Sequence, residues 1–435
     1  MAELTVAPTD RFGLRHARGG PAALGHFARA TEGVLAYRAD MMTALDDALA
    51  EEPDLPAAHA LRGLSLLLGA RRETVAMARD CLAQAEAARA ETADEVALIR
   101  ALQAGLCRGL TAAAEVLEAH LAQRPTLSLL VKLATGLRFT GGDSDGMLAA
   151  TARLLPAWAP DMPGYSHVLG CHAFALEEAG VFAEAEAQGR RALALHADDP
   201  WAIHAVAHVM EMTQRPAEGI ALIEGLRPYW QTGNPFARHV SWHLALFRLE
   251  QGDAAAALAL YDHEIRPDRS EDNRDLANAT ALLWRLRQAG VGVGDRWAEL
   301  AAIARCRREE TTLVFASLHR LLALLAVEDQ AAAHATVMAL VTAAQSGTTE
   351  QAWVAAAVGL PLARALVAMA DGAAALPLDR IAAGLAPMGG SHAQRDVFVR
   401  SLLLACDDPA MADRILAVRR RLKRDDDFVT RLVQK

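Results

Sequence analysis

The sequence predicts an all-α fold, organised as an α-α superhelix of repeated helix pairs (a helical-repeat solenoid). Hydrophobic residues make up 53% of the 435 residues and aromatic residues only 5%. Much of the apolar content is alanine and leucine, which favour helices packed through small side chains. Helical periodicity is interrupted at intervals by turns rich in Gly, Pro or Asp, and no convincing alternating strand pattern is present.

Three successive segments repeat one plan: a first helix, a turn, and a second helix closed by a polar or Pro-containing junction. These clearest repeat units cover residues 166–200, 201–234 and 235–265. The first unit is expected to turn at Gly180, because the residue after a helix often adopts positive φ. The other two are expected to turn near Pro216 and Gly252. The spacing therefore predicts paired helices throughout this region.

Elsewhere the repeats are less regular. A helix–Pro–helix junction is expected at Pro53 and Pro56, and the segment 111–125 is typical of a second helix. We expect one helical-repeat array over residues 1–435, with a C-terminal helical half covering about 274–435.

Composition limits the classes of function. The net charge of −9 gives no footprint for nucleic acid. The dense basic run at 419–424 is followed by three Asp residues and is interpreted as a solvated helix end. The five cysteines are scattered without a CxxC pair, which is typical of a reducing, cytoplasmic location. No signal peptide is evident, and no stretch approaches the ~18 apolar residues of a membrane span.

Two histidine pairs are the most informative feature of the chain. His204 and His208 lie four residues apart, as do His239 and His243, so each pair shares one helix face. Each member of the second pair follows its counterpart by 35 residues, close to the ~34-residue period of tetratricopeptide (TPR) repeats. Glu211 lies one turn beyond His208. The spacing therefore predicts four imidazoles and a carboxylate along one wall of the solenoid.

Three interpretations of these histidines are open. HxxxH spacing allows two imidazoles to bind one zinc or iron ion. The Glu that a zinc protease needs after the first His is absent, since Ala205 and Val240 occupy those positions. The histidines would otherwise line a polar ligand-binding or catalytic groove, or be structural. We predict no cofactor, with a divalent metal as the alternative. Trp242, beside His243, could stack a planar ligand, although packing explains such a Trp equally.

A second motif lies near the C-terminus. The Gly-Gly turn at 389–390 precedes Ser391, which suits a helix N-cap. Gln394, Arg395 and Asp396 fall in the first turns of the helix that follows. A helix start presents free N–H groups to an anion, although a capped helix alone explains the pattern. We expect Arg395 to pair bidentately with an anionic group.

Together these motifs resemble those of the tetratricopeptide repeat protein 38 family. The resemblance rests on DDPWAIHAVAHVMEM at 198–212, HVSWHLALFRLEQGDAAAALALYDHEI at 239–265 and GGSHAQRDVF at 389–398. It implies an all-helical TPR-like superhelix. It implies no particular reaction, so the architecture follows from the resemblance and the activity does not.

The expected function is binding of a ligand or partner in a His-lined concave groove or pocket. The expected ligand-binding residues are His204, Glu211, His239, Trp242, Gln394 and Arg395. The alternative is a small-molecule enzyme, metal-dependent or not, in which titratable groups act as general acid or base. Its expected catalytic residues are His208, His243 and Asp396. The partner is expected to be a small polar or anionic molecule, or a protein or peptide, and the solenoid ends could form a homodimer.

Overall fold

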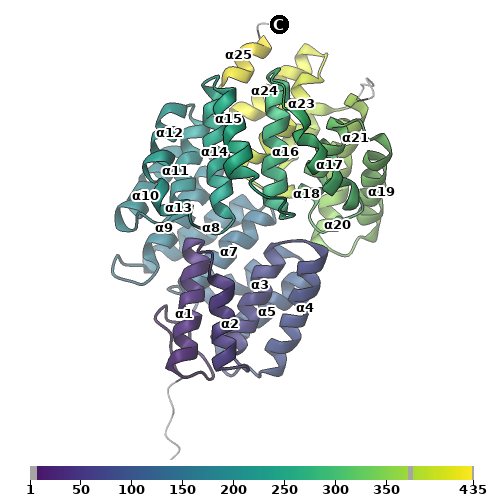
Figure 1. The fold of residues 1–435 in the computed structure, drawn as a ribbon. Coiled ribbons are helices and arrows are strands. Elements are labelled where there is room, and N and C mark those ends of the chain that lie inside the picture. The colour runs from purple at the N-terminus through teal and green to yellow at the C-terminus, as the bar shows by residue number, and fades with distance from the viewer. Residues whose placement is uncertain (1–6, 371–375, 434–435) are drawn as a thin grey trace, which may run out of the picture. The chain divides into compact units, whose positions relative to one another are not determined.

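The computed structural model describes residues 7–370 and 376–433. Across these residues the regular structure is helical, and the only β pairing is one isolated bridge between Thr9 and Arg15 (Figure 1). The predicted all-α class is confirmed. Contacts divide the chain into two compact units. Unit 1 comprises Met1–Ala179, Ala183–Ala205 and Pro228–Phe236, and unit 2 comprises Gly180–Phe182, Val206–Arg227 and Ala237–Lys435.

Unit 1 is built from consecutive helices that pack on their neighbours in the chain. Helix α1 packs on α2, α3 on α4, and α5 on α6. Their bounds are α1 Pro21–Ala36, α2 Met41–Glu51, α3 Pro56–Leu68, α4 Arg72–Ala87, α5 Ala93–Cys107, α6 Leu110–Leu121, α7 Ser128–Thr140 and α8 Ser144–Leu154. The buried core of the unit is mainly alanine and leucine, as the composition led us to expect.

Local sequence explains where these helices start and how closely they approach. Pro56 occupies the first turn of α3, where its missing N–H is not needed. Thr92 and Glu95 form a reciprocal capping box at the start of α5. Helices α3 and α5 pack closely because Gly63 lacks a side chain: a Cβ there would lie 2.3 Å from Leu102 Cδ2. Substitution of this glycine would therefore require the Leu102 side chain to move.

The three predicted repeat units form helix pairs with the expected turns. Gly180 and Gly252 both have φ of +79°, and Pro216 begins a helix. The bounds are α9 Tyr165–Glu178, α10 Phe182–Leu195, α11 Pro200–Met212, α12 Pro216–Gly225, α13 Arg227–Trp230, α14 Phe236–Glu250, α15 Ala254–Leu260 and a π-helical turn Tyr261–Ile265. The boundary between the units falls within α11, after Ala205.

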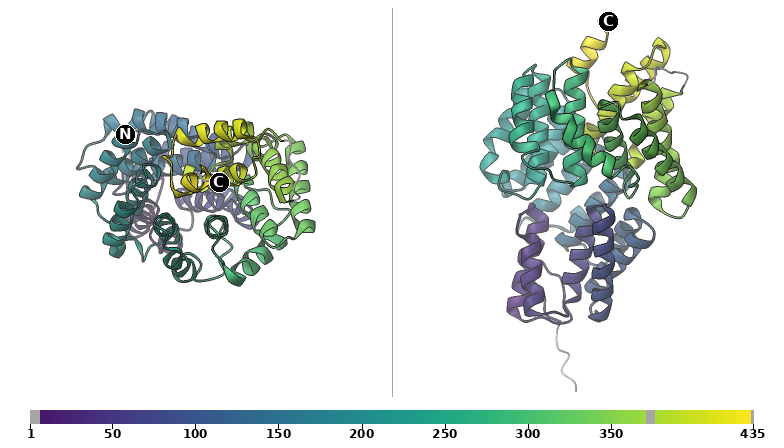
Figure 2. Two further views of the ribbon diagram at one scale, coloured as in Figure 1. Left: turned by 90° about the horizontal axis from the view of Figure 1, so that it is seen from above. Right: turned by 45° about the vertical axis from the view of Figure 1, so that its right-hand side comes forward.

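The C-terminal segment of unit 2 lies beside the unit-2 part of α11. The N–H of Arg424 donates to the carbonyl of Met212, at 2.9 Å; Figure 2 shows the C-terminal helices of unit 2 in yellow. Helix α16 also packs on α23. The bounds are α16 Asn273–Gln288, α17 Trp297–Cys306, α18 Val314–Ala326, α19 Gln330–Ser346, α20 Glu350–Val354, α21 Leu360–Ala370, α22 Leu378–Ala383, α23 His392–Leu404, α24 Pro409–Arg420 and α25 Asp427–Val433.

Within the described part of the chain, one helical segment, Glu350–Ala370 of unit 2, is long and apolar enough to cross a membrane by length and composition. Half of its most apolar 18-residue window is buried inside the protein. Core helices of water-soluble proteins meet the same criterion. The expectation that no stretch approaches the apolar length of a membrane span was therefore wrong for this segment, in which Pro361 and Arg364 interrupt the apolar sequence.

Unit 1 buries a lysine that has no hydrogen-bond acceptor among the residues that the structure describes. Lys132, on α7, is 6% exposed, and its Nζ lies 4.5 Å from the ring centroids of both Tyr37 and Trp201. Burial lowers the pKa of Lys132 below its ordinary value. Cation–π contacts offset part of the cost of removing the ammonium from water, and the remainder lowers the stability of the fold.

We expect Lys132→Met to raise the free energy of unfolding by about 1–2 kcal/mol, because it replaces a buried unpaired charge by an apolar chain of similar length. The matched control is Lys423→Met, at a buried lysine whose Nζ lies 2.9 Å from Glu211 Oε1. That change leaves a carboxylate unpaired and should lower stability. Thermal unfolding at neutral pH measures both, and a loss of stability in Lys132→Met would contradict the expectation.

Candidate functional site

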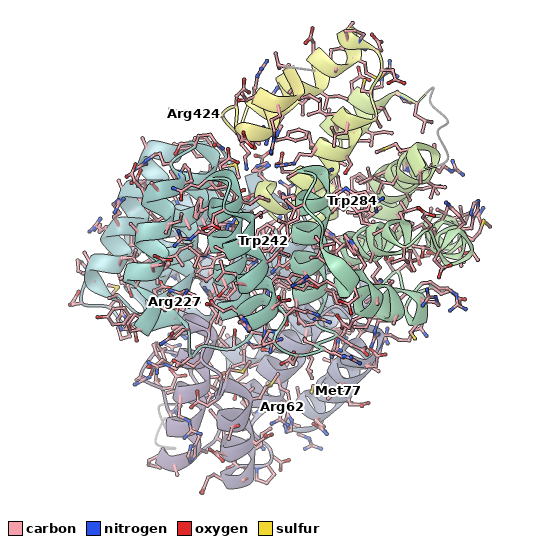
Figure 3. The ribbon with its side chains drawn as sticks, turned by 45° about the horizontal axis from the view of Figure 1, so that its top comes forward. Arg62, Met77, Arg227, Trp242, Trp284 and Arg424 are labelled. Atoms are coloured by element: carbon pink, nitrogen blue, oxygen red, sulfur yellow. The ribbon has the colours of Figure 1, made fainter. Side chains whose placement is uncertain are left out.

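The candidate site is a buried polar network within unit 2. The unit-2 part of α11 contributes His208 and Glu211, which lie one turn apart. Helix α14 contributes His239 and His243, also one turn apart, as the spacing predicts. Trp242, labelled in Figure 3, is on the same helix and is fully buried. All of these side chains are at most 6% exposed.

We call His208, His239 and His243 the histidine cluster. The ring centroids of His208 and His243 lie 4.4 Å apart, and those of His239 and His243 lie 4.8 Å apart. One ring nitrogen from each residue lies within 4.8 Å of the others. A buried group of this kind could hold a metal ion. Burial lowers the pKa of His239 well below its usual range and that of His243 to about 4, so both are neutral at pH 7.

The position of the proton on His239 follows from a chain of hydrogen bonds that starts at a backbone amide. The N–H of Ser391 can only donate, so the Gln394 oxygen that lies 3.1 Å from it is Oε1. Gln394 Nε2 then donates to Asn278 Oδ1 at 3.0 Å. This orients the Asn278 amide so that its Nδ2 donates to His239 Nδ1, also at 3.0 Å. His239 Nδ1 is therefore an acceptor, and the ring proton lies on Nε2.

The same order continues through the histidine cluster to a carboxylate. His239 Nε2–H points at His243 Nε2, 3.3 Å away. Because His243 Nε2 accepts, its own proton lies on Nδ1 and is donated to Glu211 Oε2 at 3.0 Å. Every bond in the chain from Ser391 to Glu211 thus runs in one direction.

The direction of these hydrogen bonds determines which ring nitrogens are free of a proton and could bind a metal. A metal-bound His usually donates its second ring N–H to a carboxylate or carbonyl. His243 has that arrangement with Glu211, whereas His239 has its proton on the nitrogen that faces the cluster. The nitrogen positions suit a metal, but a metal at His239 Nε2 would have to displace this proton.

The series of hydrogen bonds that starts at Ser391 ends at a group of buried charged side chains. Glu211 Oε1 accepts from Lys423 Nζ at 2.9 Å, and Lys423 Nζ lies 4.0 Å from Asp396 Oδ2. Arg419 donates to Asp396 through Nε at 2.7 Å and through Nη2 at 3.1 Å, and to Asp426 through Nη2 at 2.5 Å. The result is a continuous set of paired charges below 10% exposure.

Electrostatics fix the ionisation of these groups. Burial alone would raise the pKa of Glu211, but Lys423 and His243 hold it well below its usual value. Burial would also raise the pKa of Asp396, and the charges of Arg419 and Lys423 again outweigh that effect. Burial would lower the pKa of Lys423, but Glu211 and Asp396 raise it. Both carboxylates are thus anionic and Lys423 is cationic at neutral pH.

A cavity of about 210 Å³ borders the charged end of the network. It lies among α22, α23, α24 and the segment after α24. Its charged and polar lining consists of His392, Arg395, Asp396, Arg419, Arg421 and Lys423, and its apolar lining includes Met212, Leu385, Val399, Val418 and Leu422. A smaller cavity of about 30 Å³, beside Glu211, Arg285 and Lys423, has room for about one water.

The predicted site residues are only partly brought together. His208, Glu211, His239, His243, Gln394 and Asp396 belong to the network. Trp242 stacks on His239, with ring centroids 5.4 Å apart, and is fully buried. Arg395 lines the cavity and donates to His392 Nδ1 at 2.9 Å and to the carbonyl of Gly390. The Ser391 N-cap and the turn before it are confirmed.

His204 lies one turn before His208 on α11, in the part of the helix that belongs to unit 1. There its ring packs against aromatic side chains, with ring centroids about 5 Å apart. These neighbours are Phe174, Trp201 and Phe236. Its surroundings in unit 1 are thus those of a packed aromatic core.

Four residues that complete the network were not predicted: Asn278, Arg419, Lys423 and Asp426. The interpretation of 419–424 as a solvated helix end was wrong for two of its members, since Arg419 is 5% and Lys423 8% exposed. The intervening Arg420 and Arg421 are exposed, as expected. The i, i+4 spacing of Arg419 and Lys423 was the available signal, because it places both cations on one face.

No protein-family model matches the sequence.

Proposed function

We propose that unit 2 is a binding unit for a small organic anion, held in the cavity among α22, α23 and α24. One observation carries the proposal: the charged lining of this cavity is mainly cationic, and one of its cations, Arg419, is only 5% exposed. A bound anion would place a further counter-charge among these cations.

The charges around the cavity support an anion. Its lining has four cationic side chains, Arg395, Arg419, Arg421 and Lys423, against the single carboxylate of Asp396. Lys423 lines one side of the cavity and is held in place by Glu211 and Asp396 of the buried polar network. Ligand pockets commonly combine such a rigid polar cluster with an apolar remainder.

The proposal keeps the architecture that the sequence suggests. We propose that the helix pairs form a TPR-like superhelix of the tetratricopeptide repeat protein 38 type and that the protein acts in the cytoplasm. The regular pairs at α9–α10, α11–α12 and α14–α15 support the first part. The scattered cysteines, none of them in a disulfide, support the second.

Filling the cavity tests the proposal independently of ligand chemistry. Val399 lines the cavity and is 9% exposed, so Val399→Phe should occupy part of the space. Saturation-transfer NMR with three probes, hexanoate, hexanol and hexylammonium, should show binding of hexanoate to the wild type and weaker binding, or none, of hexylammonium. We expect Val399→Phe to weaken that binding by about tenfold or more.

Val433→Phe is the matched control, because Val433 is 70% exposed and does not line the cavity. Thermal unfolding of each variant reports whether it folds, and Ala382→Leu, on α22, replaces Val399→Phe if the latter does not. Absence of hexanoate binding to the wild type, or tighter binding of hexylammonium than of hexanoate, would overturn the proposal. Equal binding by the wild type and both cavity-filling variants would do the same.

A further inference from the structure

We infer that one side of α19 and of the helical segment Glu350–Ala370 in unit 2 binds a second copy of this chain, as a two-fold dimer (Figure 1). The segment joins α20, a π-helical turn Ala355–Gly359 and α21 into one helix. Helix α19 packs against all three parts. The cavity among α22, α23 and α24 lies elsewhere in unit 2, so dimerisation is separate from the proposed anion binding.

The outward side of Glu350–Ala370 is apolar, where the exposed side of a surface helix is normally polar. Trp353 is 58% exposed. From residue 352 to residue 363 the exposed and half-exposed positions are Trp353, Ala356, Ala357, Leu360 and Pro361. These positions recur every three or four residues, so they form one stripe along the helix. Docking would remove this apolar stripe from water.

Helix α19 continues the apolar surface. Met338 is 59% exposed. From Ala335 to Ala344 the exposed and half-exposed side chains are apolar except for Thr342, whose hydroxyl donates to the carbonyl of Met338 at 3.1 Å. We call these positions of α19 and the stripe on Glu350–Ala370 the apolar face. Trp is enriched among the residues that dominate binding at protein interfaces, and Met adapts its shape to a partner.

The charges at the two ends of the stripe indicate that the partner is a second copy. Glu350 lies seven residues before Ala357, and Arg364 lies seven residues after it. When two copies of the segment cross antiparallel at Ala357, Glu350 of each copy lies opposite Arg364 of the other. Trp353 then lies opposite Pro361 of the other copy. This reciprocity is what a two-fold interface requires.

Small side chains at the centre of the stripe allow the crossing. Ala356 and Ala357 are both exposed, and the distance between packed helices depends on the side chains at the contact. A membrane surface fits this face less well. Helices that lie on anionic bilayers carry several Lys or Arg beside their apolar side, whereas this stripe has Glu350 at one end and Arg364 at the other.

Sedimentation velocity over a concentration series measures the dimer directly. We expect the wild type to dimerise with a Kd in the micromolar range, as is typical of small interfaces. Trp353→Ala should weaken the dimer at least about tenfold. Tyr229→Ala is the matched control, because Tyr229 is also aromatic and 49% exposed but lies on α13. It should leave the Kd unchanged.

Charge reversal identifies the partner and the antiparallel direction. Arg364→Glu brings like negative charges together at both ends of the crossing, and Glu350→Arg brings like positive charges together. Each variant alone should dimerise at least about tenfold more weakly than the wild type. An equimolar mixture should recover the wild-type Kd within about threefold, because each end then pairs Glu with Arg. Recovery on mixing also shows that both variants are folded.

Three results would overturn the inference. They are a wild type that stays monomeric at about 100 μM, equal effects of Trp353→Ala and Tyr229→Ala, and charge-reversed variants that do not associate when mixed. Binding of a monomeric wild type to phosphatidylglycerol vesicles, lost in Trp353→Ala, would assign the apolar face to a bilayer instead. The anion-binding proposal would stand in each case, because hexanoate binding is measured separately.

Discussion

Replacing Asp396 by Asn is expected to lower the free energy of unfolding by about 3–5 kcal/mol. Asp396 is 5% exposed and accepts two hydrogen bonds from Arg419, which is itself buried. Asn has almost the same shape as Asp, so the change removes charge without creating a cavity. Among the described residues, Arg419 would then retain Asp426 as its counter-charge, and Lys423 would lose one of its two carboxylates.

Differential scanning calorimetry at pH 7 measures this effect. A loss of this size should lower the unfolding temperature of the transition that contains unit 2 by about 10 °C. Asp425→Asn is the matched control: Asp425 also pairs with an arginine, Arg420, but both side chains are more than 40% exposed. Exposed pairs contribute little, so the control should change the midpoint only slightly. Equal shifts in the two variants would show that burial of the Asp396 pair does not matter.

The parts of the fold that could be predicted are those determined by residues close together in the sequence. Helix pairs follow from local signals, because Gly180 and Gly252 end helices through their positive φ and Ser391 caps α23 through its own hydroxyl. Those signals lie within a few residues of the element they determine. The division into two units within α11 has no such signal, since the helix continues through it.

The histidine cluster was likewise predictable, because i, i+4 spacing fixes which side chains share a helix face. The residues that hydrogen-bond to the histidine cluster and extend the network were not predictable. Asn278 contacts Gln394 across 116 residues, and Lys423 contacts Glu211 across 212 residues. No periodicity links positions so far apart. Burial of Arg419 and Lys423 depends on where the chain end returns within unit 2, which the basic run itself does not encode.

We expect Asn278→Asp to convert the histidine cluster into a zinc site. In the wild type, Asn278 Nδ2 donates to His239 Nδ1, which places the ring proton on Nε2 between the two histidines. An Asp at 278 can only accept, so the proton of His239 moves to Nδ1. Two ring nitrogens, Nε2 of His239 and Nε2 of His243, then face each other 3.3 Å apart with lone pairs and no proton between them.

That spacing is the one zinc requires. Two nitrogens bound to zinc at ~2.0–2.1 Å in tetrahedral geometry lie about 3.3 Å apart. His243 already donates its Nδ1–H to Glu211, as metal-bound histidines usually do, and His208 can supply a third nitrogen. After dialysis against a weak chelator, elemental analysis should give about one zinc per Asn278→Asp chain and far less for the wild type. Cobalt(II) absorption in the visible range reports the same site.

A second variant tests the mechanism by a different route. Gln394→Glu keeps an oxygen for the N–H of Ser391 but faces Asn278 with an acceptor, so the Asn278 amide should turn over and present Oδ1 to His239 Nδ1. This variant is also expected to bind zinc, although residue 278 is unchanged. Asn273→Asp is the control, since Asn273 lies on the same helix and contacts Arg320. Stoichiometric zinc in the wild type, or none in either variant, would show that the hydrogen-bond order from Ser391 does not control the histidine cluster.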